Sequence, residues 1–300
     1  MLNKIVICGV GLIGGSFAAA LRQAGAVREI VGLGRSLASL QRAQELGLID
    51  VVAGSVEEAL RDADLVLLAV PVVQTEALLS QLKPWLQPHT VVTDAGSIKG
   101  EVIAAARRAL GEQIAQFVPG HPIAGSEQTG PDAALANLYV NRKVVLTPLQ
   151  ENRSTDVMLV EQAWRHCGAE VRIMSARDHD AVFAAVSHLP HLLAFALVDE
   201  LAGRANADQL FDYAASGFRD FTRIAGSSPE MWRDIALTNR AAILDELDAY
   251  ARHLEVLRHA LTAADGQALA TIFANAQRAR QAWSHSIENT EKPSVQNRDV

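Results

Sequence analysis

The feature that most constrains this chain is a glycine spacing near its N-terminus, Gly9-x-Gly11-x-x-Gly14. It follows an apolar run, Leu2–Cys8, which predicts a strand, and it opens an alanine-rich run, Leu12–Ala24, which predicts a helix. In that context Gly9 permits a tight turn, Gly11 lets the backbone approach a pyrophosphate, and Gly14 lets helix and strand pack closely. A glycine-rich turn without a ligand is the alternative, but the flanking strand and helix favour a dinucleotide site.

Short apolar runs alternate with helical patterns through the first half of the chain. They predict strands at Glu29–Leu33, Leu65–Val70 and Thr90–Thr93, and the last strands of the same domain at Lys143–Leu146 and Glu170–Met174. Runs that are apolar throughout are typical of strands buried on both faces of a parallel sheet. The sequence therefore predicts an α/β, doubly wound, Rossmann-like domain over residues 1–174.

Helical patterns alone follow from about Ser175. They predict helices at Asp178–Leu201, at Asp208–Gly217, from Pro229 to about Leu261, and at Gln267–Trp283. Ser228 fits an N-cap followed by proline at the first helical position. We therefore expect an all-α helical domain over residues 175–285, and we interpret the polar residues 286–300 as a disordered tail.

Apolar residues in the long predicted helix repeat at alternating spacings of four and three. The positions are Ile243, Leu247, Tyr250, Leu254, Leu257 and Leu261. A repeat of this kind forms a heptad-like seam. The seam predicts either packing within one chain or the interface of a homodimer, and the sequence leaves both open.

Composition excludes several classes of protein. The formal net charge of −7 argues against a nucleic-acid partner. The two cysteines, Cys8 and Cys167, predict no disulfide framework and fit a reducing cytoplasm. The sequence has neither the pattern of a signal peptide nor an uninterrupted apolar run of about 18 residues. We therefore expect a cytoplasmic protein with no membrane span.

Two further segments are expected to touch the dinucleotide. The backbone N–H groups of Leu12 and Ile13 begin the first helix, where they would face the phosphates. Val70 and Pro71 end the fourth predicted strand, at an edge that normally lies along the cofactor between ribose and nicotinamide.

The residues after the second strand bear on the choice of nicotinamide cofactor. Gly34 stands where an acidic residue usually binds the ribose hydroxyls of NAD, and Arg35 and Ser36 follow it. An arginine beside a small hydroxyl suits a 2′-phosphate. The sequence predicts NADP as the preferred cofactor and NAD as the alternative, which would bind equally well if Arg35 only flanks the adenine.

Four polar clusters each lie near an apolar run. They are Asp94-Ala95-Gly96-Ser97-Ile98-Lys99-Gly100, then Gly120-His121-Pro122-Ile123-Ala124-Gly125-Ser126-Glu127, then Ser187-His188-Leu189-Pro190-His191, and finally Gly217–Ala225 with two arginines. The first begins at the carboxyl end of a predicted strand, where ligands of open α/β sheets bind.

Taken together, these clusters resemble the prephenate dehydrogenase family, which includes cyclohexadienyl and arogenate dehydrogenases. The resemblance rests on the strings Asp-x-Gly-Ser-x-Lys, His-Pro-x-x-Gly-Ser-Glu and Ser-His-Leu-Pro-His in this order, and it extends through Ser228–Asp234. It implies a Rossmann-like domain followed by an all-α helical dimerisation domain. It also implies oxidative decarboxylation of prephenate or arogenate, with hydride transfer to NAD(P), in tyrosine biosynthesis.

The resemblance also implies roles for individual residues. His121 resembles the catalytic histidine that hydrogen-bonds the ring hydroxyl, and Ser97 the serine that orients it beside the cofactor. A neutral histidine suits a proton acceptor near pH 7, and arginine suits carboxylates by bidentate pairing. The substrate-binding residues are implied to be Ser126, Glu127 at the pocket mouth, His188, His191, Arg219 and Arg223.

Several assignments keep an alternative. His188 could be a structural histidine inside the helical domain, Arg219 a surface ion-pair former, and Lys99 either a cofactor contact or a helix cap. His188 and His191 lack a third nearby ligand, so we expect no metal. We interpret the remaining histidines as surface residues: His89, His166, His179, His253, His259 and His285.

Two other functions compete with this interpretation. A β-hydroxyacid dehydrogenase usually has a catalytic lysine in its helical domain, but no lysine occurs between Lys143 and Lys292. A regulator that only senses NADP would need the glycines, but would have no need of His121, Ser97 and Arg223 together. The sequence does not separate prephenate from arogenate.

Overall fold

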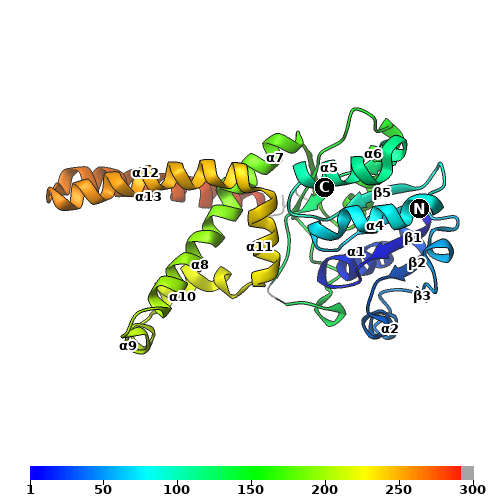
Figure 1. Cartoon of the computed structure of the whole chain (residues 1–300), viewed down its shortest axis with the longest axis horizontal. Coiled ribbons are helices and arrows are strands. Elements are labelled where there is room, and N and C mark those ends of the chain that lie inside the picture. Colours follow the sequence, from blue (N-terminus) through cyan, green and yellow to red (C-terminus); the bar gives the residue numbers. More distant parts are fainter. Residues whose placement is uncertain (127, 292–300) are drawn as a thin grey trace, which may run out of the picture. The chain divides into compact units, whose positions relative to one another are not determined.

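A six-stranded parallel sheet forms the first part of the computed structural model, which describes residues 1–126 and 128–291 (Figure 1). The strand order is β3-β2-β1-β4-β5-β6, and every pair is parallel. The strands are β1 Leu2–Cys8, β2 Val27–Leu33, β3 Val51–Val52, β4 Leu65–Leu68, β5 Val91–Asp94 and β6 Phe117–Val118. This order is that of a Rossmann-like dinucleotide-binding fold, so the predicted fold class is confirmed.

Helices cover both faces of this sheet because successive strand residues point to opposite sides. Ile5 and Ile7 of β1 belong to one buried cluster, and Val6 and Cys8 to another. Helices α1 and α6 contribute to the first cluster, and α3, α4 and α5 to the second. The bounds are α1 Leu12–Gln23, α2 Leu37–Glu45, α3 Val56–Leu60, α4 Thr75–Leu82, α5 Gly100–Leu110 and α6 Ser154–His166.

The strands predicted at Lys143 and Glu170 do form, but they do not extend the large sheet. They are β8 Lys143–Leu146 and β9 Glu170–Ile173, and they join β7 Gly120–Pro122 in a separate sheet of order β7-β8-β9. β7 runs antiparallel to β8. Pro119 lies between β6 and β7, and because proline has no N–H it cannot continue a strand ladder. The chain therefore leaves β6 after two residues and starts a new sheet.

The helical part begins with a continuous but irregular stretch from Ala176 to Ala202. It consists of α7 Ala176–Phe183, a π-helical segment Ala184–His188, and α8 Leu189–Ala202. By length and composition this stretch could cross a membrane, with a mean hydropathy of 1.9 over its most apolar window. Core helices of soluble proteins meet the same criterion, so this finding alone does not place the chain in a membrane.

Two helix predictions were wrong in extent. The predicted helix Asp208–Gly217 is divided into α9 Ala207–Asp212 and α10 Ser216–Thr222. The helix predicted from Pro229 to Leu261 is broken into α11 Pro229–Thr238 and α12 Arg240–Thr262. At the break, Asn239 has φ −103° and ψ 27°, and its side chain bonds elsewhere in the fold.

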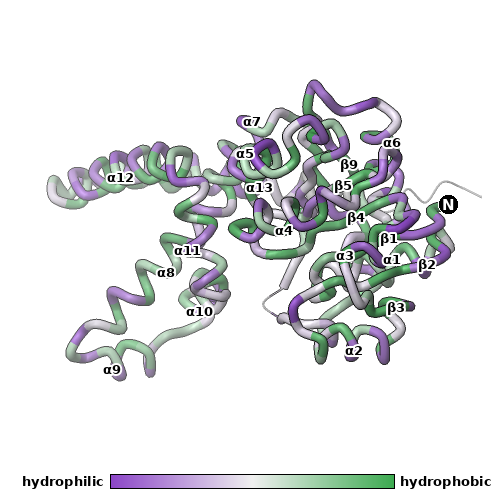
Figure 2. The backbone as a smooth tube through the Cα atoms, turned by 45° about the vertical axis from the view of Figure 1, so that its right-hand side comes forward, coloured by the Kyte–Doolittle hydropathy of each residue, from purple (hydrophilic) through white to green (hydrophobic). Residues whose placement is uncertain are grey.

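Contacts divide the chain into two compact units, Met1–Ile243 and Leu244–Val300. The second unit contains most of α12 and all of α13 Gly266–Glu291, joined by a short turn in which Ala264 has a φ of +50°. Apolar and polar residues alternate along α12 (Figure 2). α13 ends eight residues beyond the predicted Trp283, and the remainder of the predicted tail, 292–300, lies outside the described residues.

The glycine turn gives a direct test of this fold. Gly9 has a φ of +95°, and a Cβ there would lie 2.4 Å from the Ala69 carbonyl oxygen. Gly9→Ala is therefore expected to lower the free energy of unfolding by roughly 2–4 kcal/mol in urea denaturation, because backbone strain and overpacking add. Gly11→Ala is the control, since its Cβ would meet nothing within 4 Å. Equal losses in the two variants would contradict the turn geometry.

Candidate active site

A cavity of about 620 Å³ lies at the carboxyl ends of β1, β2 and β4. The glycine turn forms one wall, and Gly11 is the N-cap of α1 with an open side toward which a ligand can approach. Gly14 packs so tightly that a Cβ would lie 2.2 Å from the Gly9 carbonyl oxygen. Free N–H groups at the start of α1 and a backbone without side chains suit a pyrophosphate, so these residues fit a dinucleotide.

The predicted cofactor residues are placed differently by the fold. Those that line the cavity are Gly9, Gly11, Arg35, Ser36, Val70 and Pro71. Leu12, Ile13 and Gly14 do not line the cavity, and the Ile13 carbonyl oxygen accepts a hydrogen bond from the Tyr139 hydroxyl. Ser39 also lines the cavity beside Arg35, and its N–H and hydroxyl both bond to Ser36 Oγ.

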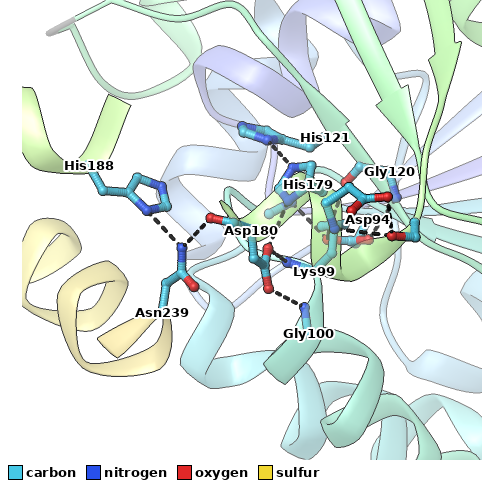
Figure 3. Close-up of polar contacts among 12 residues, drawn as sticks. Asp94, Lys99, Gly100, Gly120, His121, His179, Asp180, His188 and Asn239 are labelled. Atoms are coloured by element: carbon cyan, nitrogen blue, oxygen red, sulfur yellow. Dashed lines mark hydrogen bonds and ion pairs between the residues drawn. The ribbon is translucent and has the colours of Figure 1, made fainter. Parts of the chain in front are cut away.

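His121 lies in β7, just beyond the edge of the large sheet, and contacts residues of α7. Its Nδ1 is 2.8 Å from Nε2 of His179, whose Nδ1 is 2.8 Å from Oδ1 of Asp180 (Figure 3). Phe183 packs against both imidazole rings. We refer to His121, His179 and Asp180 as the histidine relay.

The relay determines which nitrogen of His121 is available. The Asp180 carboxylate only accepts, so the hydrogen bond between them places a proton on Nδ1 of His179. Nε2 of neutral His179 then accepts, and Nδ1 of His121 must donate to it. Nε2 of His121 is left with a lone pair that can accept a proton.

Electrostatics keep the relay in this protonation state. Burial lowers the pKa of His121 well below 6.5, and Lys99 lowers it further, as would protonation of His179 or His188. Burial also lowers the pKa of His179, although Asp180 opposes that shift. For Asp180 burial works against ionisation, but hydrogen bonds from His179 and from the N–H groups of Lys99 and Gly100 lower its pKa.

His188 differs from His121 in that its Nδ1 accepts a hydrogen bond. It is 1 % exposed, and the amide of Asn239 donates to its Nδ1 over 3.1 Å while also donating to the Asp180 carbonyl oxygen (Figure 3). Burial lowers the pKa of His188 to about 4. Neutral His188 therefore carries its proton on Nε2 and is a hydrogen-bond donor.

His191 lies one turn further along, against an aromatic side chain. Its ring stacks on Trp232 with 3.7 Å between centroids, and its Nδ1 donates to the Ser187 carbonyl oxygen. Burial and the positive charge of Arg223 lower the pKa of His191, whereas the hydrogen bond to Ser187 raises it. The charge of Arg223 therefore acts on His191.

The other predicted residues are less constrained. Ser126 is exposed, and its Oγ accepts from the Gln128 N–H, while Glu127 lies outside the described residues. Arg219 is exposed and pairs with Asp220 at 3.7 Å, as in the surface alternative. Ser97 is half-buried, and among the described residues His121 Nδ1 bonds to His179 and not to Ser97. The roles of these residues stay predictions.

The sequence interpretation of His179 was wrong. His179 is fully buried, whereas the other five histidines assigned to the surface are exposed. Nine residues separate His179 from His188, about two and a half α-helical turns, which places them on opposite sides of a regular helix. The π-helical segment changes that phase. The acidic residues on both sides of His179, Asp178 and Asp180, could have indicated a paired histidine. Trp232 lies within the segment Ser228–Asp234, for which the sequence predicts no individual role.

Residues 17–173 match the sequence model of the prephenate dehydrogenase nucleotide-binding domain, and residues 175–275 match that of the prephenate dehydrogenase dimerization domain. The chain belongs to the prephenate dehydrogenase family. Its fold and cavity make it an NAD(P)-dependent oxidoreductase of that family.

Individual members of the family are similar over nearly the whole chain. A cyclohexadienyl dehydrogenase from Zymomonas mobilis is 37% identical over 94% of this chain and 96% of its own length. The crystal structure of a prephenate dehydrogenase from A. aeolicus, with hydroxyphenyl propionate and NAD+, has a TM-score of 0.89 at 37% identity and covers 94% of this chain and 98% of that one. The Synechocystis arogenate dehydrogenase has a TM-score of 0.80 at 30% identity, covering 93% and 99%.

Proposed function

We propose that this chain oxidatively decarboxylates prephenate, with arogenate as the second candidate substrate, in tyrosine biosynthesis. The observation that carries the proposal is the histidine relay, which leaves Nε2 of His121 as an uncharged proton acceptor at the edge of the nucleotide-binding sheet. The names of similar proteins, which include prephenate, cyclohexadienyl and arogenate dehydrogenases, support the same substrates.

The side chains divide the reaction between them. The residues of the glycine turn and the end of β2 would hold a nicotinamide dinucleotide in the cavity, and it would supply the acceptor for the hydride that leaves C4 of the substrate ring. Nε2 of His121 accepts the proton of the C4 hydroxyl, and its imidazolium is stabilised through His179 and Asp180. The ring carboxylate leaves as carbon dioxide, and aromatisation drives the step. His188 donates from Nε2, and His191 with Arg223 provides the region for a substrate carboxylate.

We also propose a role for each part of the chain and a cytoplasmic location. Residues 1–174 bind the cofactor, residues 175–285 supply the helices for substrate and dimer, and the enzyme works in the cytoplasm without nucleic acid or membrane. Growth of absorbance at the reduced-nicotinamide band, with each substrate and each cofactor, tests the activity. A chain that binds NADP without turning over either substrate would be a cofactor-sensing protein instead.

In this mechanism His121 is the general base. His121→Asn should lower turnover by roughly 10²–10⁴-fold, because a general base contributes about that much. Cofactor affinity should stay nearly unchanged. In the wild type, turnover falls as acid protonates His121, and because its pKa is lowered, this acidic limb should lie well below pH 6.5. The variant should lack that limb.

Arg223→Ala is the contrasting variant, since it removes a charge that acts near His191 and leaves the relay intact. It should raise KM for prephenate more than it lowers kcat. Steady-state kinetics across pH measure both variants. If His121→Asn kept near-normal turnover with an unchanged acidic limb, another group would be the base, and His191 would be the first candidate.

We also propose that NADP is the preferred cofactor. Arg35, Ser36 and Ser39 gather at the end of β2, and Gly34 replaces the usual acid there. A guanidinium beside two hydroxyls suits the three oxygens of a 2′-phosphate. NAD, the cofactor in the A. aeolicus structure, is the alternative.

The cofactor prediction uses a charge reversal. Arg35→Asp should raise KM for NADP on the order of tenfold, since a charge-assisted hydrogen bond contributes roughly 1.5–3 kcal/mol and solvent screening reduces it at this exposed position. KM for NAD should change little, so the difference between the KM values for NADP and NAD should become smaller. Arg28→Asp, at the opposite end of β2, is the control. An unchanged KM for NADP in Arg35→Asp would show that Arg35 does not bind the 2′-phosphate.

We further propose a homodimer formed by the helical part. Residues 175–275 match a dimerization domain, and Leu247, Leu254 and Leu261 of the heptad-like seam are exposed in the single chain. Large apolar side chains left open along one stripe are typical of an interface between copies.

The assembly prediction is a dimer at micromolar concentration in analytical ultracentrifugation. Replacing Leu254 and Leu257 by aspartate should shift it to a folded monomer, as measured by sedimentation and circular dichroism. Arg252→Asp, two residues from Leu254 and therefore on the far side of α12, should remain dimeric. A monomeric wild type, or a double variant that unfolds instead of dissociating, would contradict the interface.

A further inference from the structure

A lysine is completely buried beneath the histidine relay. Lys99 is 0 % exposed, and its Nζ lies 2.5 Å from Oδ2 of Asp94, which is 2 % exposed. Taking two charges out of water is expensive even when they pair. A helix cap or a cofactor contact would keep the ammonium near the surface, so the burial of this ion pair calls for another role.

The ion pair holds both backbone groups of the residue before His121. Nζ of Lys99 donates to the Gly120 carbonyl oxygen over 2.6 Å, and the Gly120 N–H donates to Oδ1 of Asp94 over 3.0 Å (Figure 3). That carbonyl belongs to the peptide that joins Gly120 to His121. Gly120 also has little free space, since a Cβ would lie 3.1 Å from the Asp94 carbonyl oxygen. The backbone that carries His121 is therefore fixed by side chains from the end of β5.

The main chain of Lys99 holds the other end of the relay. Its N–H donates to Oδ1 of Asp180 over 2.8 Å, and the Gly100 N–H donates to Oδ2 over 2.7 Å. Asp180 bonds to His179, and His179 bonds to His121. Contacts therefore form a closed ring from the Lys99 side chain through Gly120 and the relay to the Lys99 main chain.

We propose that Lys99, paired with Asp94, is the positioning residue of His121 and adds a positive charge that opposes protonation of its imidazole. Burial lowers the pKa of Lys99 itself, but Asp94 and Asp180 oppose that shift. This inference deepens the proposed function and rests on it. Lys99 does not touch the cofactor in this assignment, because both Asp94 and the Gly120 carbonyl occupy its buried ammonium.

The charge effect has a definite sign. Lys99 acts on His121 by its positive charge, and His179 and His188 would do so when protonated, while Asp94 and Asp180 act on its neighbour His179. Removing the positive charge of Lys99 makes protonation of His121 easier and raises its pKa. Turnover falls as pH drops through that pKa, so the acidic limb should move to higher pH.

The experiment is Lys99→Met in the full-length enzyme. We expect kcat to fall by about tenfold to a hundredfold, because small misplacements of a catalytic group cost about that much. KM for NADP should be unchanged, and the acidic limb should move to higher pH. Histidine ¹⁵N NMR of the cofactor-free enzyme, with the His121 signal assigned by its loss in His121→Asn, should show the same rise in pKa. Lys143→Met, an exposed lysine of β8, is the matched control and should change none of these.

A second variant tests the same inference if Lys99→Met fails to fold. Lys99→Met combined with Asp94→Asn leaves no uncompensated charge, and it should also move the limb upward because Asp94 does not act directly on His121. An unmoved limb and NMR pKa in a folded variant would overturn the inference, as would a raised KM for NADP with normal kcat. If the acidic limb of the pH profile persisted in His121→Asn, the proposed function would be overturned instead, so the two failures are distinguishable.

Discussion

The carboxylate of Asp180 lies on the N-terminus of α5, and much of the site depends on this contact. It accepts the N–H groups of Lys99 and Gly100 from a helix that follows the nucleotide-binding sheet, and it accepts from His179 of α7. The unpaired N–H groups of a helix start favour a carboxylate at this position. One side chain thereby connects the Rossmann-like sheet to the helices and orients the imidazole that supports His121.

Burial gives the histidines of the site their separate chemistry. Desolvation keeps His121 and His188 neutral, and the partner on Nδ1 then decides what each offers at Nε2. His121 donates from Nδ1 to His179 and accepts at Nε2, whereas His188 accepts at Nδ1 from Asn239 and donates at Nε2. Two identical side chains in one site thus have opposite hydrogen-bonding roles.

Much of the site could be predicted because its parts are local strings. The glycine turn follows the carboxyl end of β1 and His121 comes shortly after that of β6, and the carboxyl ends of parallel strands lie at one edge of a sheet. His179 could not be predicted, because its burial depends on α7 packing beside β7 and on a π-helical segment that shifts the phase of the helix. For Lys99 the sequence predicted either a cofactor contact or a helix cap. Its hydrogen bond to Gly120 could not be predicted, because it joins residues 21 positions apart.

The sequence by itself determined the strand–turn–helix that binds a dinucleotide, the parallel sheet and the change to helices, because each depends on neighbours within a few residues or on a simple period. Tertiary structure alone decided the break at Asn239, whose amide bonds to Asp180 and His188 instead of continuing a helix. It also decided the burial of Lys99 and the donor and acceptor nitrogens of the histidines. These depend on which distant groups fold together, and hydrogen bonds in a desolvated site are set by that arrangement and not by local pattern.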